Sequence, residues 1–442
     1  MRVFFVTNCS LQPISFSSLN RKKVEASFTG GNIGSDGGLL LLRELDRKLH
    51  FTKKMSQVIK DNRHASYIDH NVEQLLKQRI YAIAAGYEDV NDHDQLRDDV
   101  CFQTAVGREV SLASSSTLSR FENAVDRQSQ LEISKLFVEQ FIGQQNTPPN
   151  EIILDFDPTD NKLHGHQENC HYHGYYREHC YLPLHVFCGD NLLVSLLRPS
   201  NIDGSKYSGA ILRLLVKRLR TAWPNIKIIF RGDCAFARKH ILYWCEKNNV
   251  DYIVGIASNK RLKRMASTLT NKAEKEYNVT GEKQRLFDEF NYAAASWNRS
   301  RRIVAKAEHH GKGDNLRFVV TTLKQVPDII YDHHYCPRGN MENGIKQLKL
   351  DFYSDRNSCQ NFLANQFRLL LSSIAYILLT QLRRAHHSLA WLTKAYGQTI
   401  RLKLIKIGVV IRKNTRRIQF LLTSHYPYQN DFRQLVHSIN SS

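Results

Sequence analysis

The sequence lacks the features of secreted and membrane proteins. Its nine cysteines are odd in number and include no Cys-x-x-Cys pair, so no disulfide framework is expected and the thiols should be reduced. The apolar run at 3–6 is too short for the core of a signal peptide. The longest apolar stretch, 369–379, contains two serines and falls well short of a membrane span. These absences predict a cytoplasmic protein with no membrane partner.

Acidic residues are also few for the number of basic ones. The chain has 62 Lys and Arg against 42 Asp and Glu, which gives a net charge of +20. This excess favours a polyanionic partner such as nucleic acid. A solvated basic surface, or association with ribosomes, would give the same composition. The 442 residues exceed the usual size of one domain, so two or three structural units are expected.

The first third of the chain is expected to be mostly helical. Residues 1–30 have no sustained periodicity and predict an irregular arm. Apolar residues then recur at helical spacing in 37–49, 71–85 and 128–142, and Ser114 is typical of a helix start. Pro148 and Pro149 end this pattern. We therefore predict a helical domain over residues 31–149.

Short strands and helices alternate after this boundary. The pattern predicts strands and helices in the order strand, strand, strand, helix, strand, helix, strand, over 151–157, 181–188, 192–198, 205–221, 226–230, 236–247 and 252–256. This α/β order is that of the ribonuclease-H-like fold, although other mixed α/β domains share it. We assign residues 150–256 and 331–385 to this core, 257–330 to a β-rich insertion and 386–442 to a basic C-terminal region.

Three carboxylates occupy positions that such a fold would bring together. Asp157 ends the first strand, Asp233 follows the fourth strand, and Glu342 lies in a later helical segment. The first and fourth strands are neighbours in a ribonuclease-H-like sheet. Three oxygen ligands suit two Mg²⁺ ions, or Mn²⁺ in their place, in phosphoryl transfer. Asp155 lies two residues before Asp157 on the same strand face, so strand geometry leaves the choice between them open.

Phosphate-binding groups surround Glu342 at helical spacing. Tyr335 lies seven residues before it, Arg338 lies four residues before it, and Lys349 lies seven residues after it. At about 100° per residue these offsets turn through about 20°, 40° and 20°, so the side chains share one helical face. Arg338 can hold phosphate oxygens with two hydrogen bonds and Lys349 supplies a point charge. Because Pro337 is best placed in a first helical turn, we expect Tyr335 in the loop before the helix.

These four residues resemble the Tyr-Arg-Glu-Lys signature of DDE transposases from bacterial insertion sequences, with all three spacings matched. The chain is most similar to the insertion-sequence family numbered thirteen-eighty, over about residues 30–425. Motifs that carry this resemblance are Gly86-Tyr-Glu-Asp89, His93-Asp-Gln-Leu-Arg97, Ser116-Thr-Leu-Ser-Arg-Phe-Glu122, Asp155-Phe-Asp-Pro-Thr159, His164-Gly-His-Gln167, Tyr181-Leu-Pro-Leu184 and Leu197-Arg-Pro199. The family's Asp-x-Thr pattern favours Asp157 over Asp155 as the first acid. Cys234-Ala235 departs from the smaller or more flexible residues common after the second acid.

The resemblance implies a cut-and-paste transposase that binds the terminal inverted repeats of its element, cleaves the DNA ends and joins them to target DNA. It implies that Asp157, Asp233 and Glu342 are the catalytic residues and metal ligands. Tyr335, Arg338 and Lys349 would contact DNA. The helical domain would bind the ends, and the insertion would help to hold the DNA. Pairing two ends implies a homodimer on double-stranded DNA, in the bacterial cytosol with the nucleoid.

Other interpretations remain open. A zinc module is suggested by the ligand-rich stretch 164–180, although its spacings fit no strong zinc pattern. Another ribonuclease-H-like nuclease, such as a resolvase, would share the three acids, and a non-catalytic descendant would keep the fold. Arg97, Arg120 and the run from Arg401 to Arg417, with Arg412, Lys413, Arg416 and Arg417, are either DNA contacts or surface charges.

Overall fold

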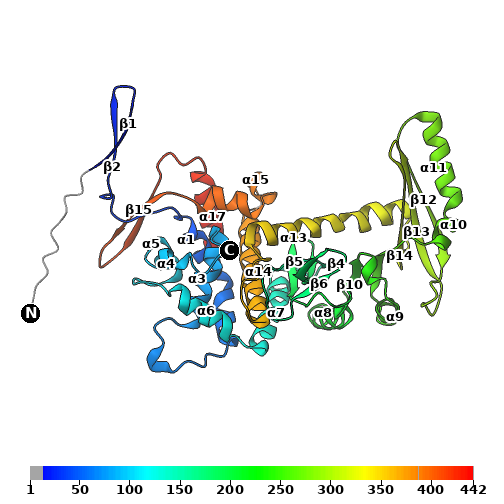
Figure 1. The fold of residues 1–442 in the computed structure, drawn as a ribbon, viewed down its shortest axis with the longest axis horizontal. Helices are drawn as coiled ribbons and strands as arrows, with labels where there is room; N and C mark the ends of the chain where they lie inside the picture. The colour runs from blue at the N-terminus through cyan, green and yellow to red at the C-terminus, as the bar shows by residue number, and fades with distance from the viewer. Residues whose placement is uncertain (1–12, 387, 442) are drawn as a thin grey trace, which may run out of the picture.

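The computed structural model describes residues 13–386 and 388–441. The irregular arm expected over residues 1–30 falls partly on 1–12, outside that range, and is wrong for 14–26, which contain two strands. Strands β1 (Ile14–Leu19) and β2 (Lys22–Ala26) form an antiparallel hairpin that projects from the body of the protein (Figure 1). Two strands of this length are too short to give sustained periodicity. Asn20 adopts a positive φ of 56° in the turn between them.

The helices expected in the first third of the chain are present, and side-chain caps explain where several begin. Asn71 and Gln74 form a capping box at α3, and Ser114 accepts a hydrogen bond from the N–H of Thr117 at α6. The helices are α1 (Leu39–Leu49), α2 (Phe51–Val58), α3 (Val72–Ala85), α4 (His93–Leu96), α5 (Val100–Val106), α6 (Ser115–Ala124) and α7 (Arg127–Gly143), with a 3₁₀ turn at Ala65–Tyr67.

A mixed sheet forms the centre of the molecule. Five of its strands are β4 (Glu151–Pro158), β8 (Leu184–Cys188), β9 (Asn191–Leu196), β10 (Lys227–Gly232) and β11 (Asp251–Ile256), in the spatial order β9-β8-β4-β10-β11, with β9 at one edge of the sheet. Strands β4, β10 and β11 are parallel, whereas β8 and β9 run antiparallel to their neighbours. Helices α8 (Ser208–Ala222) and α9 (Lys239–Lys247) pack on one face of this sheet. The expected order of strands and helices is therefore confirmed.

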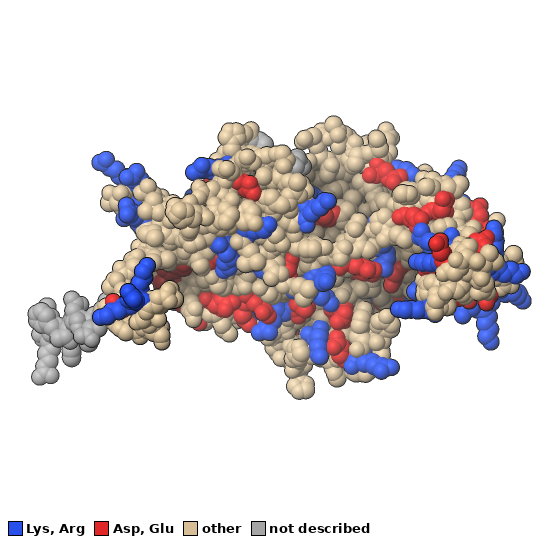
Figure 2. All heavy atoms as spheres, turned by 90° about the horizontal axis from the view of Figure 1, so that it is seen from above, with Lys and Arg blue, Asp and Glu red and all other residues tan. Residues whose placement is uncertain are grey.

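Residues 257–330 extend this sheet into an arm that reaches the far end of the molecule (Figure 1). Strand β14 (Gly313–Thr321) pairs antiparallel with β11, and β13 (Arg301–His310) and β12 (Gln284–Tyr292) follow it outward. Helices α10 (Lys260–Met265) and α11 (Ser267–Thr280) pack on one face of the arm's strands. Seen from above, Lys and Arg side chains gather at both ends of the long axis (Figure 2).

Two long helices join the sheet to the helical region. The chain passes through α12 (Pro327–Ile329), a π-helical turn (Ile330–Tyr335) and a 3₁₀ turn (Cys336–Arg338) into α13 (Gly339–Phe352). Helix α14 (Phe362–Arg384) then packs against α3, α13 and β9. By length and composition α14 could cross a membrane, but 89% of its most apolar window is buried inside the protein. It therefore serves here as the central core helix.

The C-terminal residues return to the helical region. They form α15 (Ala390–Thr393), α16 (Gly397–Ile400), a π-helical turn (Arg401–Ile405), the hairpin β15 (Val409–Lys413) and β16 (Ile418–Leu422), and α17 (Gln429–Ser441). Strand β15 pairs with β3 (Ile33–Gly34), and α17 packs against α1. Arg412, Lys413, Arg416 and Arg417 are exposed on the β15–β16 hairpin.

The chain forms a small separate sheet in the segment that connects β4 to β8. Its strands are β5 (Asn161–Lys162), β6 (His171–His173) and β7 (Glu178–Tyr181), in the order β5-β7-β6. Residues 161–181 thus form a separate module at the end of β4, beneath α13 (Figure 1).

Candidate active site

Three carboxylates from separate elements converge at one end of the central sheet. Asp157 lies near the end of β4, Asp233 follows β10 directly, and Glu342 lies in the first turn of α13. The three groups are near enough that the charges of Asp233 and Glu342 both act on Asp157. The structure therefore brings together the three acids predicted from the sequence.

The parallel register explains why the first two acids meet. On the neighbouring strands β4 and β10, Asp155 pairs with Arg231 and Phe156 pairs with Gly232. The next position on each strand is the predicted acid, so the two side chains leave the sheet side by side. Asp233 then turns its Oδ1 to the N–H of Ala235 at 2.9 Å, which starts a short 3₁₀ turn.

Arg338 lies between the first and third acids. Its Nη1 is 3.3 Å from Oδ1 of Asp157, and its Nη2 donates a hydrogen bond of 2.5 Å to Oε1 of Glu342. The guanidinium thus offsets part of the repulsion among the carboxylates. The helical spacing of Arg338 and Glu342 predicted this shared face, but it did not predict the contact with Asp157.

Asp155 has a different environment. Its carboxylate is buried and paired with the guanidinium of Arg231 through two hydrogen bonds, of which the one from Nη2 to Oδ2 measures 2.6 Å. Arg231 also donates through Nη1 to the carbonyl of His334 at 2.5 Å. Asp155 is therefore occupied by a structural partner, and Asp157 is the carboxylate that faces the cluster.

Arg231 was missed from the sequence, although a signal was present. Arg231 and Asp233 have the same two-residue spacing as Asp155 and Asp157, on a strand expected to lie beside theirs. Aligning the two pairs would have placed the arginine opposite Asp155.

The cluster shifts the pKa values of its acids. Burial, together with the charges of Asp233 and Glu342, raises the pKa of Asp157 from 3.8 to about 7, against the opposing effect of Arg338. Burial also raises the pKa of Asp233, although the N–H of Ala235 and Arg338 act against it. Both acids hold protons more tightly than free carboxylates do, because desolvation and like charges disfavour the ionised form.

This shift predicts that the Asp157→Asn variant is more stable than the wild type at high pH. Without divalent cations, folded Asp157 binds its proton up to about pH 7, whereas the unfolded group loses it near pH 4. Wild-type stability therefore falls as the pH rises between these values, by up to about 4 kcal/mol at about 1.4 kcal/mol for each pKa unit. Asn is always neutral and avoids this loss. Urea unfolding of both proteins in EDTA at pH 5 and pH 8 measures the difference, and a constant difference would contradict the assignment.

A cavity of about 360 Å³ opens beside the acids. Its lining residues are Asp157, Thr159, Glu342, Ile345, Lys346, Lys349, Leu350 and Asp355. The Nζ of Lys349 donates to the carbonyl of Asp160 and lies 3.4 Å from its carboxylate. The predicted Lys349 thus lines the cavity. Lys346 was missed, although it follows Glu342 by four residues and so shares its helical face.

The expected loop position of Tyr335 is wrong. Tyr335 ends a π-helical turn that continues through the 3₁₀ turn at Cys336–Arg338 into α13. Pro337 falls in the first turn after the π segment, where its missing N–H breaks no helical hydrogen bond. The Tyr335 ring reaches β11, where a Cβ on Gly255 would lie 2.6 Å from the tyrosine hydroxyl. Gly255 thus allows the tyrosine to approach the end of the sheet.

The family model of the transposase DDE domain, group 1, matches residues 16–442. The chain belongs to this family. No curated protein matches it. Among solved structures, the chain is similar to a piggyBac transposase synaptic complex with hairpin DNA, at 11% sequence identity and a TM-score of 0.40. That similarity covers 84% of this chain and 80% of the other. As a member of the family that the model defines, the protein is a DDE transposase, an enzyme of DNA transposition.

The donor set of this transposase suits a divalent metal ion. Asp157, Asp233 and Glu342 provide hard oxygen ligands. The pKa values of Asp157 and Asp233 are raised in part by the charges of the neighbouring carboxylates, and a cation among the three acids would offset those charges. In residues 13–386 and 388–441 no three His, Cys, Asp or Glu side chains lie close enough together to hold a metal ion as placed. Arg338 lies between two of the three acids. If a metal ion bound here, Asp157 and Glu342 would therefore give up their contacts with Arg338 and contact the ion instead.

The His- and Cys-rich stretch of the transposase forms the small β5-β7-β6 sheet. Cys180 is buried in β7, opposite His171, whereas His179 faces the other side with Tyr172. His171, His173 and Cys180 therefore share one face of this hairpin, and His179 lies on the other. Within the described residues the stretch brings no three potential ligands close enough together to hold a metal ion as placed.

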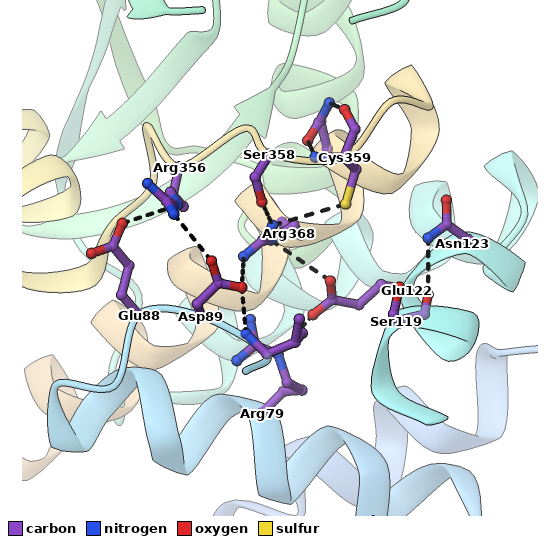
Figure 3. A network of polar contacts seen from close by, with 12 residues as sticks. Arg79, Glu88, Asp89, Ser119, Glu122, Asn123, Arg356, Ser358, Cys359 and Arg368 are labelled. Atoms are coloured by element: carbon purple, nitrogen blue, oxygen red, sulfur yellow. Dashed lines mark hydrogen bonds and ion pairs between the residues drawn. The ribbon is translucent and has the colours of Figure 1, made fainter. Parts of the chain in front are cut away.

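A buried ion-pair network joins the transposase's helical region to the segment beside the cavity (Figure 3). Glu122 on α6 accepts a hydrogen bond from Nε of Arg79 on α3 at 2.7 Å, and its other oxygen is 3.6 Å from Arg368 on α14. Arg368 also approaches Asp89, which pairs with Arg356 at 3.1 Å. Arg356 directly follows the cavity residue Asp355. The network therefore links α3 and α6 to the wall of the candidate active site.

The two arginines singled out for phosphate binding are not part of this network. Arg97 is half-buried, with its Nε out of contact with solvent, whereas Arg120 is exposed and donates to the hydroxyl of Thr117 at 3.2 Å. Of the two, Arg120 is the one available to a surface ligand.

Proposed function

We propose that this DDE transposase belongs to the insertion-sequence family numbered thirteen-eighty and performs cut-and-paste transposition. It would bind the terminal inverted repeats of its element, cleave the DNA at both ends and join the 3′-hydroxyls to target DNA. The observation that carries the proposal is the convergence of Asp157, Asp233 and Glu342 beside a cavity lined by Lys346 and Lys349. Carboxylates for metal ions and cations for phosphates are the parts that phosphoryl transfer needs.

The strand order β9-β8-β4-β10-β11 supports a ribonuclease-H-like core. Strands β4 and β10, at whose ends Asp157 and Asp233 lie, are parallel neighbours. In this proposal residues 150–256 and 331–385 form the catalytic core and 257–330 the inserted arm. Residues 31–149 bind the element's ends, and two copies of the chain act together on double-stranded DNA.

The residues around the acids would have distinct roles. Asp157, Asp233 and Glu342 would hold two Mg²⁺ ions, or Mn²⁺ in their place, which activate the attacking oxygen and stabilise the leaving one. Arg338 is placed to turn from the carboxylates to phosphate oxygens, because its guanidinium already lies among them. Lys349 would neutralise a phosphate in the cavity, and the hydroxyl of Tyr335 would contact the DNA backbone near β11.

Removing the metal tests the proposal. The full chain is mixed with duplexes taken from the DNA that flanks its gene, in Mg²⁺ or Mn²⁺. We expect cleavage that releases 3′-hydroxyls at the element's ends, loss of cleavage on adding EDTA and recovery with excess Mg²⁺. Duplexes of equal length from inside the gene serve as the control and should stay intact. Cleavage that persists in EDTA, or that is equally strong in the control duplexes, would contradict the proposal.

A further inference from the structure

The hairpin of β15 and β16 carries cations without acids, at the end of the molecule opposite to the arm (Figure 1). We call this hairpin, residues 409–422, the basic ribbon. Its cations are Arg412, Lys413, Arg416 and Arg417, all exposed, and it contains no Asp or Glu. Lys413 pairs with Glu109 at 2.9 Å, but the three guanidinium groups have no carboxylate partner among the described residues. Uncompensated positive charge of this kind attracts a polyanion.

The strand register sorts the side chains of the basic ribbon onto two faces. Val409 and Ile411 are buried and pack against Cys101 of α5. The alternate positions face solvent, and there Arg412 lies directly opposite Gln419, with both residues exposed. Because side chains alternate along a strand and pair across it, this arginine and this glutamine project side by side from the outer face.

Backbone contacts hold the basic ribbon in one conformation. At its base β15 pairs with β3, and the N–H of Ile411 donates to the carbonyl of Asn32 at 2.8 Å. At its tip, Oδ1 of Asn414 accepts hydrogen bonds from the N–H groups of Arg416 and Arg417, at 3.0 and 2.9 Å. The arginines are therefore presented from a frame that is ordered before any ligand binds, which lowers the entropic cost of binding.

A two-stranded ribbon with these side chains fits the major groove of duplex DNA. That groove is about 12 Å wide and admits an α-helix or a β-ribbon. In it an arginine can form two hydrogen bonds with guanine and a glutamine two with adenine, so Arg412 and Gln419 match two neighbouring base pairs. Arg416 and Arg417 at the tip suit the flanking phosphates. Single strands are bound by stacking rings, but the ribbon's one aromatic residue, Phe420, is half-buried on the inner face.

We propose that the basic ribbon enters the major groove at the element's end and reads its sequence, with Arg412 on a guanine and Gln419 on a neighbouring adenine. The inference rests on the proposed function and adds residues that determine sequence specificity to it. In that proposal residues 31–149 bind the ends, whereas the ribbon belongs to the region 386–442. The pairing of β15 with β3 joins the two parts, so that they form one DNA-binding unit.

The test measures binding of the full chain to duplexes of the element's end by fluorescence anisotropy, in EDTA so that none is cut. In a series of duplexes each base pair is replaced in turn. We expect replacement of one G·C pair to weaken wild-type binding about tenfold, and Arg412→Ala to be indifferent at that pair alone. Gln419→Ala should be indifferent at a neighbouring A·T pair. Arg417→Ala should weaken binding to every duplex alike and lower the slope of log K against log salt by about one.

The matched control is Arg433→Ala. Arg433 is also an exposed arginine of the C-terminal region, but it lies on α17, outside the basic ribbon. Its replacement removes the same charge and should leave the base preferences and the salt slope unchanged. If Arg433→Ala weakened binding as much as Arg417→Ala, general positive charge would explain both effects and the role of the ribbon would be refuted. Thermal unfolding of each variant shows that the protein is folded before binding is compared.

The outcomes separate the two proposals. A wild type that cuts element ends with metal, while Arg412→Ala and Gln419→Ala keep every base preference, would overturn only the reading by the ribbon. A wild type that neither cuts nor distinguishes end DNA from unrelated DNA would overturn the proposed function, and the reading with it.

Discussion

Replacing Asp157, Asp233 or Glu342 singly by alanine is expected to lower the rate of metal-dependent DNA cleavage by about a thousandfold or more. Each acid contributes ligand oxygens from a different element, so no neighbour can replace it. A metal ion that stabilises charge in the transition state is worth several kcal/mol, and about 1.4 kcal/mol corresponds to a factor of ten. Single-turnover cleavage of end duplexes measures the loss.

Glu342→Ala is the most informative of the three, because the Glu342 side chain is 54% exposed and its removal should leave the fold intact. A variant that is fully folded and fully active would refute the assignment of Glu342. The combined triple variant should be no slower than the slowest single variant, since the three acids act as one unit.

Asp155→Asn is the matched control for these variants. It removes a carboxylate two residues from Asp157 but leaves Arg231 buried without a counter-charge, at a cost of about 3–5 kcal/mol in unfolding free energy. We expect a less stable protein whose folded fraction still cleaves DNA. A stable but inactive Asp155→Asn protein would instead make Asp155 a ligand.

Glu122→Gln is expected to lower the free energy of unfolding by about 3–5 kcal/mol. Glu122 is 1% exposed and is shared by Arg79, also 1% exposed, and by Arg368. Removing the negative charge leaves the buried Arg79 without its carboxylate partner, while Arg368 keeps its contact with Asp89 at 3.7 Å, and burial without a partner is costly for a charge. His93 cannot compensate, because burial and Arg79 hold its pKa well below the usual range. Urea unfolding followed by circular dichroism measures the change.

A surface ion pair of similar geometry provides the control. Arg218 donates two hydrogen bonds of 2.6 and 2.5 Å to Glu139, between α8 and α7, but both side chains are about 40% exposed. Glu139→Gln should cost less than about 1 kcal/mol. If both substitutions cost the same, the burial of the network would not be what stabilises it.

Strand and helix order could be read from the sequence because it depends on local periodicity. The short apolar runs of β4, β10 and β11 and the caps at Asn71 and Ser114 are properties of neighbouring residues. The meeting of Asp157 and Asp233 followed from one topological rule, that neighbouring parallel strands end at the same edge, whereas Glu342 on α13 was assigned by its resemblance to the transposase signature. The conformation of Tyr335 did not follow, since a π-helical turn has no clear signature in sequence.

Contacts between distant segments could not be read in this way. The pairing of Arg231 with Asp155, 76 residues away, follows only once β10 is set beside β4 in register, and the pairing of Glu122 with Arg368 depends on how α6 packs against α14. The sequence shows a motif that ends in Glu122, but not its burial. The β1–β2 hairpin was missed because its strands are short and lack a buried face.

The continuity of the eight-stranded sheet has a mechanical consequence. Because β14 is hydrogen-bonded to β11, and β11 to β10 beside the acids, the arm and the cleavage centre cannot swing independently. A DNA molecule that touched both would meet two fixed points, and its own bending would have to close any gap between them. The stiffness of the flanking DNA would then influence where the element is cut and inserted, with flexible pyrimidine–purine steps favoured over rigid A-tracts.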